Sequence, residues 1–316
     1  MRALVTGAAG FIGSRLSHRL VAEGHEVMGL DDLSEGSLAT LDDSPEVELV
    51  QGDLRDEAAV ISAAKGCDVI FHQAAIRSVP RSMDEPALAT DVNVRGTLNV
   101  VMAAKEAGSR VVFASSSSVY GDQETFPLRE DMTPSPKSPY AGSKLAGEVY
   151  CSVWWRAFRV PTVSLRYFNV YGPRQNPLSE YAAVVPRFIL ACLRGLTPVI
   201  HGDGKQARDF TFVDDVVDAN LRAGRAPEEA FGRAFNIGGG TGPTSVNRLL
   251  AIVADATGTR PQPEFTSSRP GDVRWTEGDI SLARSLLGYE PRTGVVEGIR
   301  RTVGWFREGD ASAGTR

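Results

Sequence analysis

The sequence predicts an α/β fold in which a doubly wound parallel sheet is followed by a smaller C-terminal α/β lobe. In the first half, short apolar runs alternate with longer amphipathic stretches, which is typical of a parallel sheet covered by helices on both faces. The apolar runs are rich in valine and isoleucine and do not alternate strictly, so we expect strands buried on both sides. After about Tyr167, proline and glycine become frequent and the regular alternation is lost, which indicates a lobe of different construction.

The predicted elements of the sheet domain follow from these runs. Helices are expected over Phe11–Glu23, Pro86–Ala107 and Pro139–Phe158, where apolar residues recur at helical spacing. The predicted strands are Ala3–Thr6, Glu26–Leu30, Val47–Gln51, Val69–His72, Val111–Ala114 and Thr162–Arg166.

The loss of regular strand–helix alternation after about Tyr167 also predicts the domain boundaries. Residues 1–167, together with about 211–237, are expected to form the sheet domain. The smaller lobe is expected to comprise 168–210 and 238–308. The tail 309–316 has no apolar anchor, so we expect it to be disordered.

Composition excludes several classes of protein. A net charge of −5 does not fit a nucleic-acid-binding surface, and no apolar stretch approaches the ~18 residues of a membrane span. The amino terminus lacks the apolar run of a signal peptide. Cys67, Cys151 and Cys192 are widely separated and lack the spacing of metal ligands. We therefore expect a cytoplasmic protein with reduced thiols and no metal site.

A glycine-rich turn directly follows the first predicted strand. Gly7, Gly10 and Gly13 recur at every third position, and a helix is expected to begin at Phe11 and Ile12, inside the motif. Glycines here permit a tight turn, let the backbone approach a pyrophosphate, and bring the helix close to the strand. The helix N-terminus adds amide donors and a partial positive charge. The motif therefore predicts a dinucleotide-binding site of Rossmann type.

Acidic residues end the next two strands. Asp31 and Asp32 lie about 20 residues beyond the glycines, where a carboxylate accepts hydrogen bonds from the adenosine ribose. A carboxylate there would repel the 2′-phosphate of NADP, and no arginine is adjacent, so the sequence favours NAD. Asp53 closes the third strand and is a candidate to face the adenine amino group.

The helix predicted from Pro139 carries a tyrosine and a lysine on one face. Ser138 can cap this helix and Pro139 suits its first position, so Tyr140 and Lys144 stand one turn apart. A tyrosine titrates near ~10, and its use as a base at neutral pH requires a pKa lowered by roughly 3 units. We expect the lysine ammonium and the positive nicotinamide ring to lower it. This spacing alone is common on helices and does not identify a site.

A row of hydroxyl groups ends the predicted strand Val111–Ala114. It begins at Ser115, includes Ser116, Ser117 and Ser118, and is followed by Val-Tyr-Gly. Open α/β sheets bind their ligands at the carboxyl ends of the strands, so these hydroxyls are expected to line the site. A serine in this place can hold a reacting hydroxyl group and relay its proton to the tyrosine.

Together, the glycine motif, the serine row and the Tyr-x-x-x-Lys pair resemble the extended short-chain dehydrogenases/reductases over residues 2–307. The resemblance implies NAD in the Rossmann domain and a nucleotide-sugar in the C-terminal lobe. It assigns Ser116 as the catalytic serine, Tyr140 as the base and Lys144 as its partner. The segment beginning at His72 resembles the family segment beside the nicotinamide, although His72 also suits the core. Further cofactor contacts are implied at Leu54, Ala74, Ala75, Arg77, Asn93 and Tyr167.

The resemblance also narrows the reaction. Related 4,6-dehydratases carry Asp-Glu where this chain has Ser117 and Ser118, and related decarboxylases carry Glu at the second position. The remaining activity is 4-epimerisation, by oxidation at the sugar C4, rotation of the 4-keto sugar and hydride return. A UDP-glucuronate 4-epimerase, another dehydratase or reductase of the family, and a non-catalytic dinucleotide-binding regulator are the alternatives.

The smaller lobe is expected to bind a UDP-sugar. In the family, Asn169 reaches a phosphate, Arg208 and Arg269 neutralise the diphosphate, and Asp272 meets the ribose, while His201 stands where relatives stack an aromatic ring on uracil. Other substrate contacts are implied at Ser78, Val79, Ser116, Ser117, Ser118, Tyr140, Ala183, Val184, Val199 and Thr276.

Substrate size and assembly are also predicted from the resemblance. Thr276 and Ala183 are small, which leaves room for an N-acetyl group, and Asn176 lacks the positive charge typical of uronate epimerases. UDP-glucose and UDP-N-acetylglucosamine, with their galacto epimers, are therefore favoured over UDP-glucuronate. Family members dimerise through a four-helix bundle, which the 86–107 and 139–158 helices would form here. Trp154 or Trp155 could lie in that interface or in the core.

Overall fold

The computed structural model describes residues 1–177, 183–268 and 273–313, without the side chains of residues 309–313. The predicted fold class is confirmed: seven parallel strands form one sheet in the order β11-β6-β5-β4-β1-β2-β3. The chain reverses its direction of winding between β1 and β4, which is the switch point where such sheets bind ligands. The strands are β1 (Arg2–Thr6), β2 (Glu26–Asp31), β3 (Glu48–Gln51), β4 (Val69–His72), β5 (Arg110–Ser116), β6 (Thr162–Tyr167) and β11 (Arg233–Ile237).

One expectation about the strands is wrong. β3 stands at the edge of the sheet, and its residues are exposed or half-buried, with Val50 among the exposed apolar side chains. It therefore lacks the cover on both faces that its valine suggested, because the flanking helices α1 and α2 pack on the inner strands and leave β3 largely open. β11 was not predicted as a strand, and it pairs with β6 from Arg233 to Ile237.

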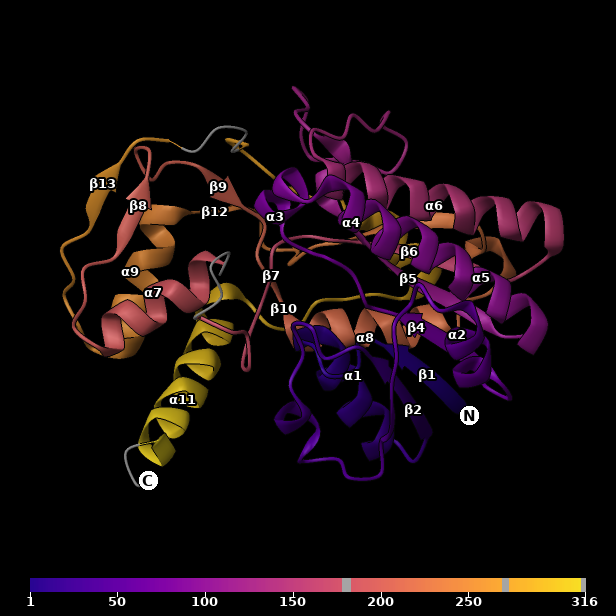
Figure 1. The fold of residues 1–316 in the computed structure, drawn as a ribbon. Helices are drawn as coiled ribbons and strands as arrows, with labels where there is room; N and C mark the ends of the chain where they lie inside the picture. Colours follow the sequence, from indigo (N-terminus) through magenta and orange to yellow (C-terminus); the bar gives the residue numbers. More distant parts are fainter. Residues whose placement is uncertain (178–182, 269–272, 314–316) are drawn as a thin grey trace.

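Helices cover both faces of the sheet (Figure 1). On one face pack α2 (Glu57–Ala64), α5 (Gly96–Ala107) and α6 (Pro139–Phe158), and on the other α1 (Phe11–Ala22) and α8 (Val213–Gly224). The helix expected over 86–107 is divided into α4 (Pro86–Thr90), a π-helical turn (Asp91–Arg95) and α5. A wide turn of this kind often marks a functional position.

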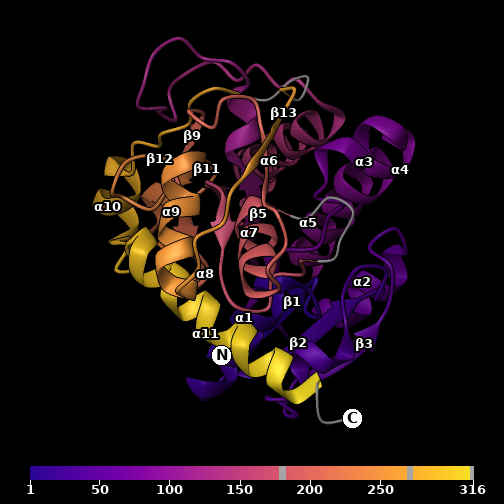
Figure 2. The ribbon, with the colours of Figure 1, turned by 90° about the vertical axis from the view of Figure 1, so that its left-hand side faces the viewer.

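The smaller lobe lies beyond the carboxyl ends of the strands (Figures 1 and 2). Its core contains Phe188, Ile189, Leu249 and Ile299 from three different helices. The short strands are β7 (Val170–Tyr171), β8 (Val199–His201), β9 (Ala207–Arg208), β10 (Thr211–Phe212), β12 (Thr244–Ser245) and β13 (Glu264–Thr266). The helices of this lobe's core are α7 (Val184–Leu193), α9 (Val246–Thr257) and α11 (Val295–Ala313). The remaining α-helices of the described chain are α3 (Val79–Asp84) and α10 (Ser281–Leu287).

The last helix is anchored in the smaller lobe. The helical backbone of α11 continues to Ala313. Ile299, Val303 and Phe306 anchor this helix in the lobe, and an anchored helix can continue beyond its last apolar contact because each further turn adds backbone hydrogen bonds. Among the described residues, no helix is long and apolar enough to cross a membrane.

Candidate active site

The glycine-rich turn has the geometry of a phosphate-binding loop. Gly7 has a φ of +69°, and a Cβ there would lie 2.8 Å from the backbone of Ala74. A Cβ on Gly13 would lie 1.9 Å from the carbonyl oxygen of Gly7. α1 begins directly after Gly10, which offers no side-chain cap, so the first amides of the helix remain available to an anion. Glycine at these two positions lets the turn pack tightly against Ala74 and against the start of α1, and the amides at the start of this helix fit the pyrophosphate of NAD.

Asp31 is placed beneath this turn. Its carboxylate is buried and accepts hydrogen bonds from the N–H of Ala9 at 2.9 Å and the N–H of Leu33 at 2.8 Å. Burial raises the pKa of Asp31. Asp32 is exposed and accepts from the amide and hydroxyl of Ser34. Both acids therefore lie at the carboxyl end of β2, where Asp31 holds the glycine-rich turn in place, and their contact with the adenosine ribose stays a prediction.

Asp53 and Leu54, which follow the third strand and are predicted to contact the cofactor, both form hydrogen bonds with other residues of the protein. The Asp53 carboxylate pairs with Arg55, whose guanidinium lowers the pKa of Asp53. Leu54 is buried, and its carbonyl accepts a hydrogen bond from Asn99. An Asp53 contact with adenine stays a prediction, since Arg55 already engages this carboxylate.

Tyr140 and Ser116 meet at the carboxyl end of β5. The predicted cap is confirmed: the Ser138 hydroxyl accepts from the Ala141 amide at 3.1 Å, and α6 begins at Pro139. A hydrogen bond with Ser116 lowers the pKa of Tyr140, but burial has the larger effect, and the net result is a raised pKa. The Ser118 hydroxyl donates to Ser116 Oγ at 2.8 Å, so the serines form one connected group.

Lys144 is buried against the end of β5. Its Nζ donates to the carbonyl oxygen of Ala114 at 2.7 Å and lies 5.0 Å from the centre of the Phe113 ring. Burial lowers the pKa of Lys144 to about 7, and the groups that lower the pKa of Tyr140 are Ser116 and Arg77. The expected lowering of the Tyr140 pKa by the lysine ammonium together with the nicotinamide ring of bound NAD⁺ therefore stays a prediction.

Asn93 links the helix pair to the loop after β4. Within the π-helical turn, its side chain accepts from the Ile76 amide at 2.8 Å and donates to the Ile76 carbonyl at 3.0 Å. It also donates to Ser143 Oγ at 2.9 Å, directly beside Lys144. Asn93 is buried and fixes Ile76 of this loop, while its contact with the cofactor stays a prediction.

The remaining residues of this loop lead from the glycine-rich turn to α3. Ala74 and Ala75 are half-buried beside the glycine-rich turn, and Arg77 is exposed and ion-paired with Glu35. Ser78 caps α3 and Val79 is 41% exposed, so both are accessible to a ligand. The Tyr140 amide donates to Ser82 Oγ at 3.1 Å, which fixes the start of α6 on α3.

Two residues of the cofactor region lie in the core. His72 is buried between the hydroxyls of Thr6 and Thr97, at 2.8 and 2.9 Å, and burial lowers its pKa to about 3. The Tyr167 ring is buried and its hydroxyl bonds with Gln73 and Asn220. The Tyr167 side chain is therefore held within the core, and its contact with the cofactor stays a prediction.

The smaller lobe brings several predicted substrate residues together. Asn169 has a φ of 23°, and its Nδ2 donates to the Asp209 carbonyl at 3.2 Å and to Thr276 Oγ1 at 3.4 Å. The Thr276 amide donates to the carbonyl of Ala207, beside Arg208. Asn169, Arg208 and Thr276 thus form one cluster close to the end of β6.

The other described residues that are predicted to contact the substrate lie on β8 and at the start of α7. Val199 and His201 stand on β8, where His201 Nδ1 is 2.8 Å from Thr266 Oγ1 of the paired β13. Ala183 and Val184 begin α7. Arg269 and Asp272 lie outside the described residues.

A buried ion pair beneath the serine row was not predicted. Glu148 and Arg166 form two hydrogen bonds of 2.9 and 2.8 Å, with side chains 8% and 5% exposed. Ser115 also donates to Glu148, and Arg166 lies over the Tyr120 ring at 4.7 Å. Glu148 follows Lys144 by one helical turn, so the sequence could have predicted that both side chains lie on the same inward face of α6. The sequence could not have predicted that Arg166 of β6 is the partner of Glu148.

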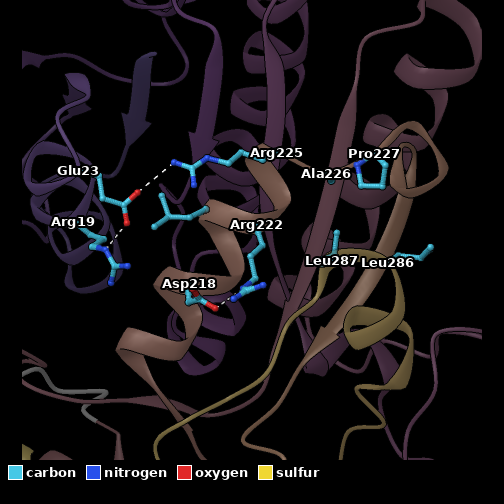
Figure 3. Close-up of a pocket in the computed structure, with 10 residues that line it drawn as sticks. Arg19, Glu23, Asp218, Arg222, Arg225, Ala226, Pro227, Leu286 and Leu287 are labelled. Atoms are coloured by element: carbon cyan, nitrogen blue, oxygen red, sulfur yellow. Dashed lines mark hydrogen bonds and ion pairs between the residues drawn. The ribbon is translucent and has the colours of Figure 1, made fainter.

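A separate pocket lies near the C-terminal ends of α1 and α8, on the side of the sheet where the strands begin (Figure 3). Its arginines are already paired with acids: Arg19 and Arg225 with Glu23, and Arg222 with Asp218. It therefore contributes nothing to the site around Tyr140.

The chain matches known proteins over nearly its whole length. Residues 3–238 match the NAD dependent epimerase/dehydratase family. The UDP-glucose 4-epimerase of Mycolicibacterium smegmatis is 46% identical over 97% of this chain and 99% of the relative. The structure of UDP-glucose 4-epimerase with UDP-glucose from Thermotoga maritima has a TM-score of 0.93 at 36% identity, covering 98% of this chain and 99% of the other.

A second similar structure belongs to an epimerase that is named for a different sugar. The UDP-N-acetylglucosamine 4-epimerase from Methanobrevibacter ruminantium, in complex with UDP-N-acetylmuramic acid, has a TM-score of 0.93 at 35% identity. The match covers 98% of each chain. Similar proteins therefore differ in the sugars that they bind.

Proposed function

Because the chain belongs to the NAD dependent epimerase/dehydratase family, we propose that it is a UDP-hexose 4-epimerase. Its substrates are UDP-glucose and UDP-galactose, together with UDP-N-acetylglucosamine and UDP-N-acetylgalactosamine. The observation that carries this proposal is the group around Tyr140, in which Ser116 bonds with Tyr140 and Ser118, while Ser117 and Ser118 are hydroxyls where a dehydratase would need carboxylates.

The chain's own residues divide the proton chemistry between them. Ser116 Oγ holds the C4 oxygen of the sugar beside Tyr140, and Tyr140 Oη takes the proton from that oxygen and later returns it. Lys144 fixes the end of β5 through Ala114, and Asn93 fixes the loop that faces Tyr140. NAD, when bound, supplies the acceptor and donor of the C4 hydride.

Proton NMR tests the reaction directly. The purified enzyme is incubated separately with UDP-glucose, UDP-N-acetylglucosamine and UDP-glucuronate, without added reductant. The first two are expected to yield the galacto-configured anomeric signal. A 4-keto product, or no product from any substrate, would contradict 4-epimerisation, whereas fastest turnover of UDP-glucuronate would favour the uronate alternative despite the uncharged Asn176.

Thr276 is proposed to leave room for the N-acetyl group. It lies within hydrogen-bond distance of Asn169, at the centre of the proposed substrate cluster. Thr276→Tyr is expected to lower kcat/KM for UDP-N-acetylglucosamine at least about tenfold more than for UDP-glucose, because the ring fills space that only the larger sugar needs. Steady-state kinetics with both substrates measure this. Equal losses for the two sugars would remove Thr276 from the specificity argument.

We propose a homodimer formed through α5 and α6. Val149 and Val153 are 55% and 44% exposed on the outer surface of α6, and an apolar surface of this kind suits a helix interface. Trp155 packs edge-on against Phe231, with ring centres 5.2 Å apart. Val149→Glu with Val153→Glu is expected to give a monomer in sedimentation experiments. The control Val296→Glu, on α11 and 39% exposed, should leave the assembly unchanged, and a dimeric double variant would disprove this interface.

A further inference from the structure

The segment 33–44 lies directly against the glycine-rich turn. The amide of Ser37 and the hydroxyl of Thr40 both donate to the carbonyl oxygen of Ala9, at 3.2 and 2.9 Å. A Cβ on Gly36 would lie about 3 Å from Ala9, so the backbone of this segment is in close contact with the backbone of the glycine-rich turn. This segment follows Asp31 and Asp32, and it therefore borders the adenosine half of the proposed NAD site.

An arginine from the smaller lobe holds this segment. Arg174 follows β7, and its Nη1 donates to the Thr40 carbonyl at 2.6 Å while Nη2 pairs with Asp43. His18 of α1 reaches the same carbonyl through Nε2 at 2.7 Å and Ser44 Oγ through Nδ1 at 2.5 Å. The Arg174 side chain is 18% exposed, so its charge is largely enclosed by these partners.

The backbone of Arg174 adds to this observation. Its φ is +70°, in the left-handed region that residues with a Cβ rarely adopt. Such a conformation persists where surrounding contacts hold it, and strained positions concentrate at functional sites. The contacts that hold Arg174 are those with the segment 33–44.

The other end of the segment is fixed independently. Glu35 pairs with Arg81 at 2.8 Å and with Arg77 at 3.5 Å, both from the loop and helix that follow β4. The segment 33–44 is thus attached to the loop facing Tyr140 at one end and to the smaller lobe at the other.

We propose that Arg174 is a positioning residue for the cofactor: it holds the segment 33–44 closed on the glycine-rich turn and so slows the release of NAD. An enzyme that returns the hydride to its own substrate gains nothing from exchanging its cofactor during turnover. The inference concerns the NAD site alone and does not depend on which sugar is bound.

The test measures the release of cofactor without any sugar. Each variant is loaded with NADH and mixed with excess NAD, and the loss of bound-NADH fluorescence gives the dissociation rate. Arg174→Met is expected to raise this rate about tenfold, because it removes charge-assisted hydrogen bonds to the segment. Asp43→Asn should have a smaller effect, since the bond to the Thr40 carbonyl remains. Hydrogen exchange at the Ser37 amide should become faster in Arg174→Met, since this amide opens with the segment.

Two further variants make the outcome specific. Arg174→Gly loses the same side chain but relieves the backbone, so it should release NADH as fast as Arg174→Met. Arg284→Met removes a surface ion pair with Glu290 far from the segment and should leave the rate unchanged. A rate in Arg174→Met within twofold of the unmodified enzyme, or a normal rate in Arg174→Gly, would overturn the proposal. Neither result bears on 4-epimerisation, which the NMR experiment tests separately.

Discussion

Replacing Tyr140 by phenylalanine is expected to abolish turnover while leaving NAD bound. The substitution removes only the hydroxyl that pairs with Ser116, and this hydroxyl is the proposed acceptor of the proton from the sugar C4 oxygen. Loss of a positioned acid–base group lowers rates by about 10²–10⁴-fold. The measurement is kcat for UDP-glucose, together with the NAD content of the purified variant.

Tyr150→Phe provides a matched control for this prediction. Tyr150 lies on the same helix, where its ring packs edge-on against Trp154 at 5.8 Å, away from the serine row. This variant is expected to retain full activity. Full activity in Tyr140→Phe would instead show that the catalytic assignment of Tyr140 is wrong.

Breaking the buried pair of Glu148 and Arg166 is expected to give the largest loss of stability. Glu148→Gln leaves the Arg166 guanidinium buried without its counterion and weakens the hydrogen bond from Ser115. Removing one partner of such a pair costs about 3–5 kcal/mol in the free energy of unfolding. Urea denaturation of the two proteins at equal concentration measures this difference.

The double variant distinguishes a buried charge from lost packing. Glu148→Leu with Arg166→Met removes both charges, so it should destabilise the protein less than either single change. Glu290→Gln breaks the exposed pair with Arg284 and is expected to leave the denaturation midpoint nearly unchanged. A Glu148→Gln protein as stable as the parent would contradict a paired buried charge. An equal loss in the double variant would assign the effect to packing.

The sequence by itself predicted the features that depend on neighbouring residues. The strand, glycine-rich turn and helix over residues 3–22 form one continuous unit, and Gly7 has the positive φ that a tight turn requires. The Ser138 cap and the first position at Pro139 are set by hydrogen bonds within one helical turn. The spacing of Tyr140 and Lys144 follows from the same geometry. Alternation of strands and helices was sufficient to predict the parallel sheet.

The tertiary structure decided everything that depends on which elements become neighbours. The Lys144 ammonium bonds with Ala114 on β5, so its effect on Tyr140 could not be read from their spacing. Glu148 meets Arg166 only because α6 crosses β6, and Arg174 reaches Thr40 across 134 residues of chain. β3 is exposed because it stands at the edge of the sheet. Hydrogen bonding and hydrophobic periodicity within an element are local, whereas burial, charge pairing and the resulting pKa values are set by the packing of distant segments.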